Sequence, residues 1–364
     1  MDEISLNKKT MKVVFVISSL TSGGAERVLT TLANHWSEKG WDVTILAILS
    51  HDSGFYRLHE RINLVSLDMR YKNSVLNTFW YFYGIRKVVK ELRPNYVISF
   101  ISAINIYTLI ALLGVRQKTI ISERNNFDSL KSKFWRSFRR LTYPLSDGLV
   151  VLSGYDYEMY PYVDSKQIIF NPLNIKALLN SPFENKEKQI LAVGKLTEQK
   201  GFERLIHAVS KIDLGAWQVI IIGEGPKHNE FSRLIKNLNL ETNVKLVGRK
   251  SNVYEYFQKA SIFVLSSHWE GFPNVLSEAM AHGCSCVSFD CKTGPSDIIE
   301  DGINGYLIPQ NDVQALENKI HQLMHDEEQR KKFYSESLKI RDKLNLDKVS
   351  KEWEDYLEIV NEAK

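Results

Sequence analysis

Short runs of aliphatic and β-branched residues alternate along the chain with stretches in which apolar residues recur every three or four positions. The apolar runs of the first half are 13–18, 43–49, 96–100, 118–122 and 148–152, with a helical pattern at 26–39. The second half has apolar runs at 189–193, 218–222, 244–247, 262–266 and 285–289, with helical patterns at 202–211, 227–238 and 275–282. Strands that alternate with helices predict parallel sheets with helices on both faces. We therefore expect an α/β fold.

The pattern breaks at 170–188, where Asn171-Pro172 and Asn180-Ser181-Pro182 interrupt it and polar residues collect. A length of 364 residues suits two domains of ordinary size. We expect one Rossmann-like domain over 1–172 and a second over 173–345. The tail after residue 312 shows only helical patterns, and its last helix, within 346–364, is expected to pack back on the first domain.

One segment, 96–115, contains 20 residues without a charge, which is long enough to span a membrane. Polar residues interrupt it, and Asn105 resembles the N-cap of a new helix that follows a strand at 97–100. A strand, a turn and a buried helix are therefore favoured over a membrane span.

Composition and charge place the chain among folded proteins with an uneven surface. Three cysteines in 364 residues exclude a secreted disulfide scaffold and favour a reducing, cytoplasmic setting. The polar start of the chain gives no indication of a signal peptide. Residues 1–171 hold 22 Lys and Arg against 15 Asp and Glu, whereas the remainder has 25 against 28, so the basic surface belongs to the first domain.

The most informative segment runs from Glu270 to Gly283. It holds two carboxylates, Glu270 and Glu278, with a Gly-Phe-Pro-Asn turn between them and a predicted helix under the second. The N–H groups at the start of a helix favour an anion, whereas carboxylates favour hydroxyl groups or cations. A sugar nucleotide offers a diphosphate for the first and sugar hydroxyls for the second.

Other glycine-rich turns follow predicted strands. Gly194-Lys195 and Lys200-Gly201 bring two ammonium groups to a strand-to-helix connection, where a diphosphate would find neutralising charge. Turns at 222–226 and at 247–249, which contains Arg249, are expected at the same sheet edge. The Gly23-Gly24 turn is a weaker indication, since a tight strand–helix connection explains it equally well.

Together these motifs resemble retaining glycosyltransferases of family 4, which have the two-domain GT-B fold. The resemblance rests on the Glu-x7-Glu pair of Glu270 and Glu278, on Gly194-Lys195-Leu196 followed by Lys200-Gly201, and on Ser-Gly-Gly-Ala-Glu-Arg at 22–27. It extends from residue 11 to about residue 357. It implies a nucleotide-sugar donor, expected to be UDP-linked, and no metal or other cofactor.

The resemblance also implies roles for single residues. Glu270 would bond the transferred hexose, Glu278 the ribose, and Lys195 and Lys200 the phosphates. Arg249 would border the base, and Gly23 and Gly24 would approach the diphosphate. The backbone of the turn between the two glutamates would contact sugar and diphosphate, through Gly271, Phe272, Pro273, Asn274, Val275 and Leu276.

Retaining chemistry of this family is usually drawn as a same-face substitution, in which the leaving diphosphate helps to deprotonate the acceptor hydroxyl. The candidate catalytic residues are Glu270, Lys200, Lys195, Arg124 and Glu123. The chain departs from the family at Arg124, where many relatives have a histidine, because arginine cannot act as a base at neutral pH. It also has Lys195 where arginine is commoner, which keeps the charge but loses a bidentate contact.

Two basic and aromatic stretches are candidates for the acceptor side. The first contains Phe134, Trp135, Arg136, Arg139 and Arg140, and this mixture suits a segment beside anionic lipid headgroups. The second, 77–92, places Arg86, Lys87 and Lys90 behind five aromatic residues. It is similar to the helix of bacterial N-acetylgalactosaminyltransferases that holds a lipid-linked pyrophosphate. Ordinary amphipathic helices with aromatic residues in the core are the alternative for both.

We therefore expect a peripheral enzyme on the inner face of the cytoplasmic membrane. It would transfer a hexose or N-acetylhexosamine from a UDP-sugar to a polyprenyl-diphosphate-linked saccharide in surface polysaccharide or glycan biosynthesis. A GDP-mannose-dependent mannosyltransferase and a non-catalytic sugar-nucleotide or lipid-binding module remain alternatives. No nucleic-acid motif is present. A zinc site at His282, Cys284, Cys286 and Cys291 is disfavoured relative to buried thiols, because alternating strand residues converge poorly on one ion.

Overall fold

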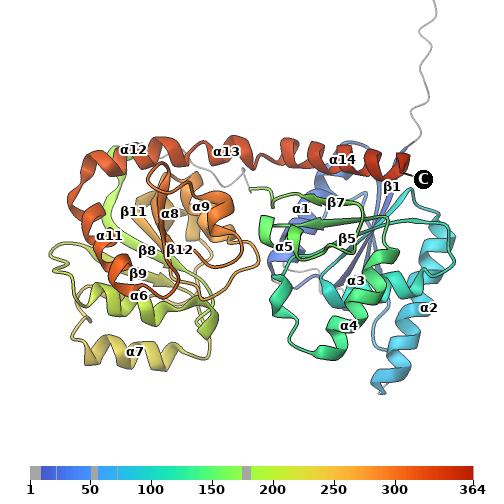
Figure 1. The fold of residues 1–364 in the computed structure, drawn as a ribbon, viewed down its shortest axis with the longest axis horizontal. Helices are drawn as coiled ribbons and strands as arrows, with labels where there is room; N and C mark the ends of the chain where they lie inside the picture. Colours follow the sequence, from blue (N-terminus) through green and yellow to red (C-terminus); the bar gives the residue numbers. More distant parts are fainter. Residues whose placement is uncertain (1–9, 22, 51–55, 72, 174–181, 364) are drawn as a thin grey trace, which may run out of the picture. The chain divides into compact units, whose positions relative to one another are not determined.

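Seven parallel strands form the first of two sheets in the computed structural model, which describes residues 10–21, 23–50, 56–71, 73–173 and 182–363 (Figure 1). The start of the chain before Thr10, Ser22 of the Gly-Gly turn and Asn180-Ser181 of the predicted linker lie outside the described residues. The strand order is β3-β2-β1-β4-β5-β6-β7. The strands are β1 (Lys12–Ser19), β2 (Asp42–Ser50), β3 (Asn63–Ser66), β4 (Tyr96–Phe100), β5 (Lys118–Ser122), β6 (Gly148–Val151) and β7 (Lys166–Ile168).

The second sheet has six parallel strands in the order β10-β9-β8-β11-β12-β13. They are β8 (Glu187–Val193), β9 (Gln218–Ile222), β10 (Val244–Leu246), β11 (Ala260–Leu265), β12 (Ser285–Phe289) and β13 (Gly305–Ile308). The central strands β11 and β12 are buried along their whole length, which explains their continuous apolar sequence. The predicted α/β class is confirmed.

Helices connect the strands of both sheets. Those that follow the strands of the first sheet are α1 (Gly24–Glu38), α2 (Ser74–Leu92), α3 (Ser102–Ala111), α4 (Lys133–Thr142) and α5 (Gly154–Glu158). Those of the second half are α6 (Phe202–Val209), α7 (His228–Asn237), α8 (Val253–Lys259), α9 (Asn274–Ala281), α10 (Pro295–Ile298), α11 (Val313–His325), α12 (Glu327–Ser337), α13 (Ile340–Lys343) and α14 (Leu346–Glu362).

Two compact units are present. Unit 1 comprises 1–152, 156–172 and 349–364, and unit 2 comprises 153–155 and 173–348. The long helix α14 supplies the returning part of unit 1. Its Tyr356 hydroxyl accepts a hydrogen bond from the Leu149 N–H at 3.0 Å, and its Ser350 hydroxyl accepts one from Trp36 Nε1 at 2.9 Å. Helix α14 is thus part of the interior of unit 1.

The uncharged segment 96–115 forms the buried strand β4, a turn at Ile101 and helix α3. Asn105 is not the N-cap of α3, as its sequence context suggested, because the helix begins three residues earlier at Ser102. Instead the buried Asn105 amide bonds Ser99, Ser122 and Glu123. None of the helices within the described residues combines the length and hydrophobicity that a membrane crossing requires.

Candidate functional site

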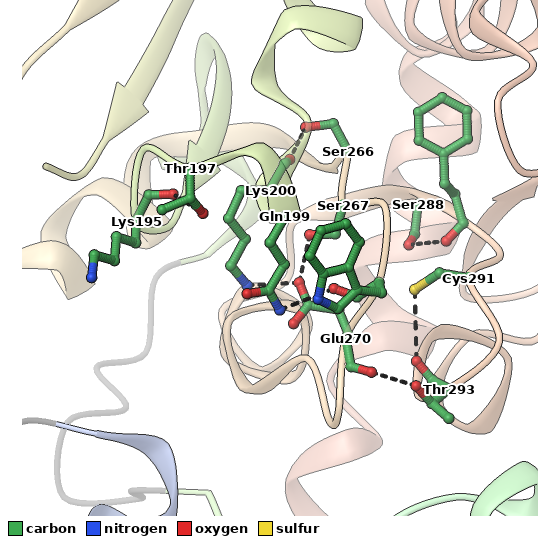
Figure 2. Close-up of polar contacts among 12 residues, drawn as sticks. Lys195, Thr197, Gln199, Lys200, Ser266, Ser267, Glu270, Ser288, Cys291 and Thr293 are labelled. Atoms are coloured by element: carbon green, nitrogen blue, oxygen red, sulfur yellow. Dashed lines mark hydrogen bonds and ion pairs between the residues drawn. The ribbon is translucent and has the colours of Figure 1, made fainter. Parts of the chain in front are cut away.

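A buried ion pair lies at the carboxyl edge of the second sheet. Lys200 Nζ is 2.6 Å from Glu270 Oε1, and the side chains are 18% and 5% exposed (Figure 2). The Ser267 hydroxyl donates to the same carboxylate oxygen at 2.5 Å. Both of these bonds go to Oε1, and none of the hydrogen bonds described for this carboxylate goes to Oε2. Two of the predicted site residues, one from each glycine-flanked segment, are therefore in direct contact.

The loops that carry this pair are joined by two further hydrogen bonds, both accepted by main-chain carbonyls. The Ser266 hydroxyl donates to the Lys200 carbonyl at 2.9 Å, and the His268 N–H donates to the Gln199 carbonyl at 2.8 Å. These bonds fix the segment after β11 against the segment after β8, its neighbour in the sheet. The position of Glu270 relative to Lys200 is therefore set by main chain as well as by the ion pair.

Three glycine turns meet beside these loops, as the sequence predicts. The Gly194 N–H donates to the Ile222 carbonyl at 2.9 Å, and the Gly223 N–H donates to the Gly248 carbonyl at 3.0 Å. Gly223 has a φ of +152°, and a Cβ there would lie 1.8 Å from the Gly194 carbonyl oxygen. Only glycine permits this approach, because any side chain would overlap the neighbouring turn.

Helix α9 begins directly after the Glu270 turn, with Pro273 at its N-cap and no side chain capping it. Such a helix start offers N–H groups and positive potential to an anion. The Leu276 N–H already donates to the Pro273 carbonyl at 2.9 Å, so this amide, expected to hold the diphosphate, has an internal partner. Phe272, Pro273 and Glu278 are buried, whereas Gly271, Asn274 and Val275 are half-buried.

The other basic residues of this edge are exposed. Lys195 points away from the Lys200–Glu270 pair (Figure 2), and Arg249 lies on the surface after β10. An exposed cation can be recruited by a bound diphosphate, whereas Lys200 would have to share its proton donors with Glu270. The two lysines that appear equivalent in sequence therefore stand in different environments.

Ser267 and Thr293 were not predicted as site residues. Ser267 bonds the Glu270 carboxylate, as described above, and the Thr293 hydroxyl donates to the Glu270 carbonyl. Both the side chain and the main chain of Glu270 are therefore held in place. Ser267 could have been found from its place three residues before Glu270 at the end of an apolar run. Thr293 comes from the loop after the next strand, β12, and no local pattern connects it with Glu270.

In unit 1, the Gly23-Gly24 turn leads into helix α1. The Tyr56 hydroxyl donates to the Gly23 carbonyl at 2.8 Å. The carboxyl group of Glu26 folds back against Gly23, where a Cβ would lie 2.1 Å from its Oε2, and burial raises the pKa of this carboxyl. An acid therefore lies beside the helix start at which a diphosphate was expected, and the two groups would compete for it.

Glu123, a candidate catalytic residue, is a group of the interior of unit 1. Its carboxylate accepts hydrogen bonds from Ser102, Asn105 and Tyr143. The residue is 1% exposed, and burial raises its pKa. This arrangement does not support a direct catalytic role, and the carboxylate instead ties β5 to α3 and to the chain after α4.

Arg124, next in sequence, is also enclosed. Its guanidinium donates to Asn171 Oδ1 at 2.7 Å and lies over the rings of Phe100 and Trp353, with centroid distances of 4.9 and 5.6 Å. Burial lowers its pKa to about 9. Arg124 joins the end of β5 to helix α14, and its Nε and Nη2 are buried without a hydrogen-bond partner among the described residues.

Two residues predicted for the acceptor and membrane surface donate hydrogen bonds to main-chain carbonyls of unit 1. Arg139 is 1% exposed, lies 3.8 Å from the Phe127 ring centroid and donates to the Phe127 carbonyl. Arg86 donates to the carbonyls of Ala111 and Leu113 at the end of α3. Lys87, Lys90, Phe134, Arg136 and Arg140 are exposed, whereas Trp135 is half-buried.

The three cysteines are buried and free, in agreement with the prediction of buried thiols. Across the described ranges, no group of three or more His, Cys, Asp or Glu residues is placed to hold a metal ion. The His282 ring bonds the Glu278 carbonyl through Nδ1 and stacks on Phe257, so it belongs to the packing beneath α9.

Known proteins share both sequence and fold with this chain. Residues 177–339 match the family described as glycosyl transferases group 1, and residues 22–160 match glycosyltransferase family 4. A Campylobacter jejuni protein named GalNAc-α-(1→4)-GalNAc-α-(1→3)-diNAcBac-PP-undecaprenol α-1,4-N-acetyl-D-galactosaminyltransferase is 31% identical over 364 residues, covering 97% of this chain and 99% of that protein.

A second C. jejuni protein, N-acetylgalactosamine-N,N'-diacetylbacillosaminyl-diphospho-undecaprenol 4-α-N-acetylgalactosaminyltransferase, is 30% identical, covering 93% of this chain and 96% of its own length. Among solved structures, HepE from Anabaena in complex with UDP superposes with a TM-score of 0.82 at 17% identity, covering 96% of this chain and 100% of that one. The predicted resemblance is confirmed: the chain belongs to glycosyltransferase family 4 and has the GT-B fold.

Proposed function

We propose that the protein transfers a hexose or N-acetylhexosamine from a UDP-sugar to a polyprenyl-diphosphate-linked saccharide, with retention of anomeric configuration. The observation that carries the proposal is the Lys200–Glu270 pair at the start of helix α9. The cation and the helix start suit a diphosphate, and the carboxylate suits the hydroxyl groups of a sugar. The identity of about 30% to two transferases named for undecaprenyl-linked substrates supports this acceptor class.

In the proposed donor complex, Glu270 Oε2 accepts a hydrogen bond from a hydroxyl of the transferred sugar. Lys200, Lys195 and the Val275 N–H face the diphosphate, and Glu278 faces the ribose. The contact of Lys200 with Glu270 allows the lysine to lie between the carboxylate that binds the sugar and the phosphate. One side chain would then contact both the protein's sugar-binding group and the diphosphate of the donor.

The proposed reaction is a substitution on one face of the sugar. The acceptor hydroxyl oxygen forms a bond to the anomeric carbon as the bond from that carbon to the β-phosphate oxygen breaks. The hydroxyl proton passes to the leaving phosphate, and UDP departs. The task of the protein is to stabilise the negative charge that develops on the diphosphate, and we assign it to the lysines and backbone amides, without a metal ion.

The proposed place of action is the inner face of the cytoplasmic membrane, where the enzyme would associate peripherally with anionic lipids. A polyprenyl-linked acceptor is held in a membrane, and unit 1 carries the excess of basic residues. The proposed biological setting is surface polysaccharide or glycan assembly.

The test is a donor screen with the purified protein and undecaprenyl-diphosphate-linked saccharides. UDP-glucose, UDP-galactose, their N-acetylated forms and GDP-mannose are supplied separately, and products are identified by intact mass and anomeric NMR signals. We expect UDP release and an added α-linked sugar from one UDP donor. Transfer from GDP-mannose alone would replace the UDP assignment, and no turnover with any donor would contradict the proposed function.

A further inference from the structure

Six aromatic rings form a continuous row across helices α2, α3 and α4. Phe79 and Phe82 of α2 lie 6.4 Å apart between centroids, and Phe82 lies 5.5 Å from Tyr107 of α3. Tyr107 lies 5.9 Å from Trp135 of α4, and Trp135 lies 5.8 Å from Phe134 and 6.4 Å from Phe138. These residues, Phe79, Phe82, Tyr107, Trp135, Phe134 and Phe138, are called the aromatic row.

The row lies at the surface of unit 1. Phe79 is 64% exposed at one end and Phe134 is 61% exposed at the other. The four rings between them are half-buried, so each ring of the row keeps part of its surface accessible. A contiguous exposed apolar surface of this kind marks an interaction site more often than an isolated ring does.

Aliphatic side chains extend the exposed apolar surface at both ends. Val75 and Leu76 on α2 are 60% and 49% exposed, and Leu141 on α4 is 72% exposed. Leu141 is seven positions after Phe134, so the two share one face of their helix. Helix α3 packs against both α2 and α4, and the three helices lie close together in Figure 1.

The positive charges beside the aromatic row favour an anionic partner surface. Lys133, Arg136 and Arg140 of α4 are exposed, and no acidic residue occurs between Asp128 and Asp147. Exposed aromatic residues among cations are typical of segments that lie at the interface of an anionic membrane. A purely apolar partner would leave these cations without counter-charges.

We propose that the aromatic row is a single membrane-docking surface, which binds bilayers that contain anionic lipids. Phe79 and Phe134 insert among the acyl chains, while Lys133, Arg136 and Arg140 contact headgroup phosphates. Tyr107 and the half-buried rings join the two ends through α3. The inference rests on the proposed function and deepens it, because the two basic stretches become parts of one surface.

The full-length protein is tested by co-sedimentation with phosphatidylcholine vesicles, with and without phosphatidylglycerol. The double variant Phe79→Ser/Phe134→Ser should weaken binding roughly tenfold for each ring removed, since burial of an aromatic side chain is worth about that factor. Ile359→Ser on α14 is the matched control, because Ile359 is 57% exposed and lies outside the row. Equal binding by the wild type and the double variant would overturn the proposal.

Charge reversal provides an independent arm. Arg136→Glu/Arg140→Glu should abolish the preference for phosphatidylglycerol vesicles, whereas Arg233→Glu/Lys236→Glu on the exposed face of α7 should leave it unchanged. Size-exclusion chromatography accompanies both arms. If the serine variant turns a dimer into a monomer without changing vesicle binding, the row is an interface between copies and the membrane proposal fails.

Activity separates this inference from the proposed function. With a short-chain, water-soluble acceptor, Phe79→Ser/Phe134→Ser should transfer sugar at the wild-type rate, whereas its turnover of vesicle-embedded undecaprenyl acceptor should fall with vesicle binding. Loss of turnover on both acceptors would contradict a purely membrane-docking role. A wild-type protein that binds vesicles but turns over neither acceptor would refute the proposed function and leave the docking surface intact.

Discussion

Lys200 and Glu270 hold each other at the carboxyl edge of the second sheet, with 2.6 Å between ammonium nitrogen and carboxylate oxygen. The contact joins a residue after β8 to a residue after β11, two neighbouring strands that are far apart in sequence. If the proposed roles are right, the contact places the cation for the phosphate next to the carboxylate for the sugar before any donor binds. Preorganised charge of this kind is what stabilises a leaving group effectively.

Replacing Glu270 should separate catalysis from folding. In Glu270→Gln, the amide oxygen can still accept from Ser267 and Lys200, but the charge is lost. We expect the turnover rate, measured as UDP release from the donor, to fall roughly 100-fold or more. The circular dichroism spectrum should be unchanged. The control is Glu198→Gln, because Glu198 is an exposed residue in the segment after β8. Full activity of Glu270→Gln would remove this residue from the reaction centre.

Removing only the lysine should destabilise unit 2. In Lys200→Met the Glu270 carboxylate stays buried without its cation, which costs about 3 kcal/mol in the free energy of unfolding. Urea denaturation measures this loss. Adding Glu270→Gln should restore most of the lost stability, whereas Lys195→Met, at an exposed position, should change it little. Additive losses in the double variant would show that the pair is not coupled.

The contact between glycine turns makes a steric prediction. Gly223→Ala forces a methyl group onto the Gly194 carbonyl, and we expect a loss of more than about 3 kcal/mol in stability together with loss of UDP binding by calorimetry. Gly215 also has a positive φ, but no atom lies within 4 Å of its Cβ position. Gly215→Ala should therefore cost only about 1 kcal/mol. Equal effects would mean that backbone strain, and not crowding, sets the cost.

The buried Glu123 predicts a pH dependence of stability. Burial raises the pKa of this carboxyl above its ordinary value of 4.5, so the folded protein retains a proton that the unfolded chain releases. The free energy of unfolding should therefore fall as pH rises from about 4.5 through the raised pKa. Glu123→Gln should flatten this part of the curve of melting temperature against pH. An unchanged slope in the variant would assign the dependence to other groups.

Metal removal tests the proposed charge neutralisation. Because lysines and backbone amides are assigned to the diphosphate, we expect the transfer rate to be unaffected by EDTA and by added Mg²⁺ or Mn²⁺. The transfer rate of the Lys195→Met variant is measured in the same assay. If wild-type activity disappears with EDTA and returns with a divalent cation, the lysines do not suffice.

The sequence predicted the central strands because their apolar runs are continuous. It missed β3, β7 and β13, each of three or four residues at the edge of a sheet. Only one side of an edge strand pairs with a neighbour, so its sequence needs no long apolar run. Polar residues in β3 and β7 hid the strand pattern.

The side-chain environments were harder to predict than the motifs. Arg139 and Arg140 are adjacent in a basic helix, yet one is buried between Phe127 and Tyr160 and the other is exposed. The partners of Arg139 lie 12 and 21 positions away, beyond any local pattern. Likewise, the Lys200–Glu270 contact spans 70 positions and arises from strand order, which a motif does not encode.

Helix α14 has a consequence for how the protein is made. Its Trp353, Tyr356 and Val360 are buried among residues of unit 1, and the Tyr96 hydroxyl donates to the Leu357 carbonyl. During synthesis, the strands of unit 1, which lie between residues 12 and 168, are made long before α14. Unit 1 therefore exposes the surface that α14 covers until residues 349–362 are available to pack on it. Chaperone binding to nascent chains should persist on unit 1 until α14 has emerged.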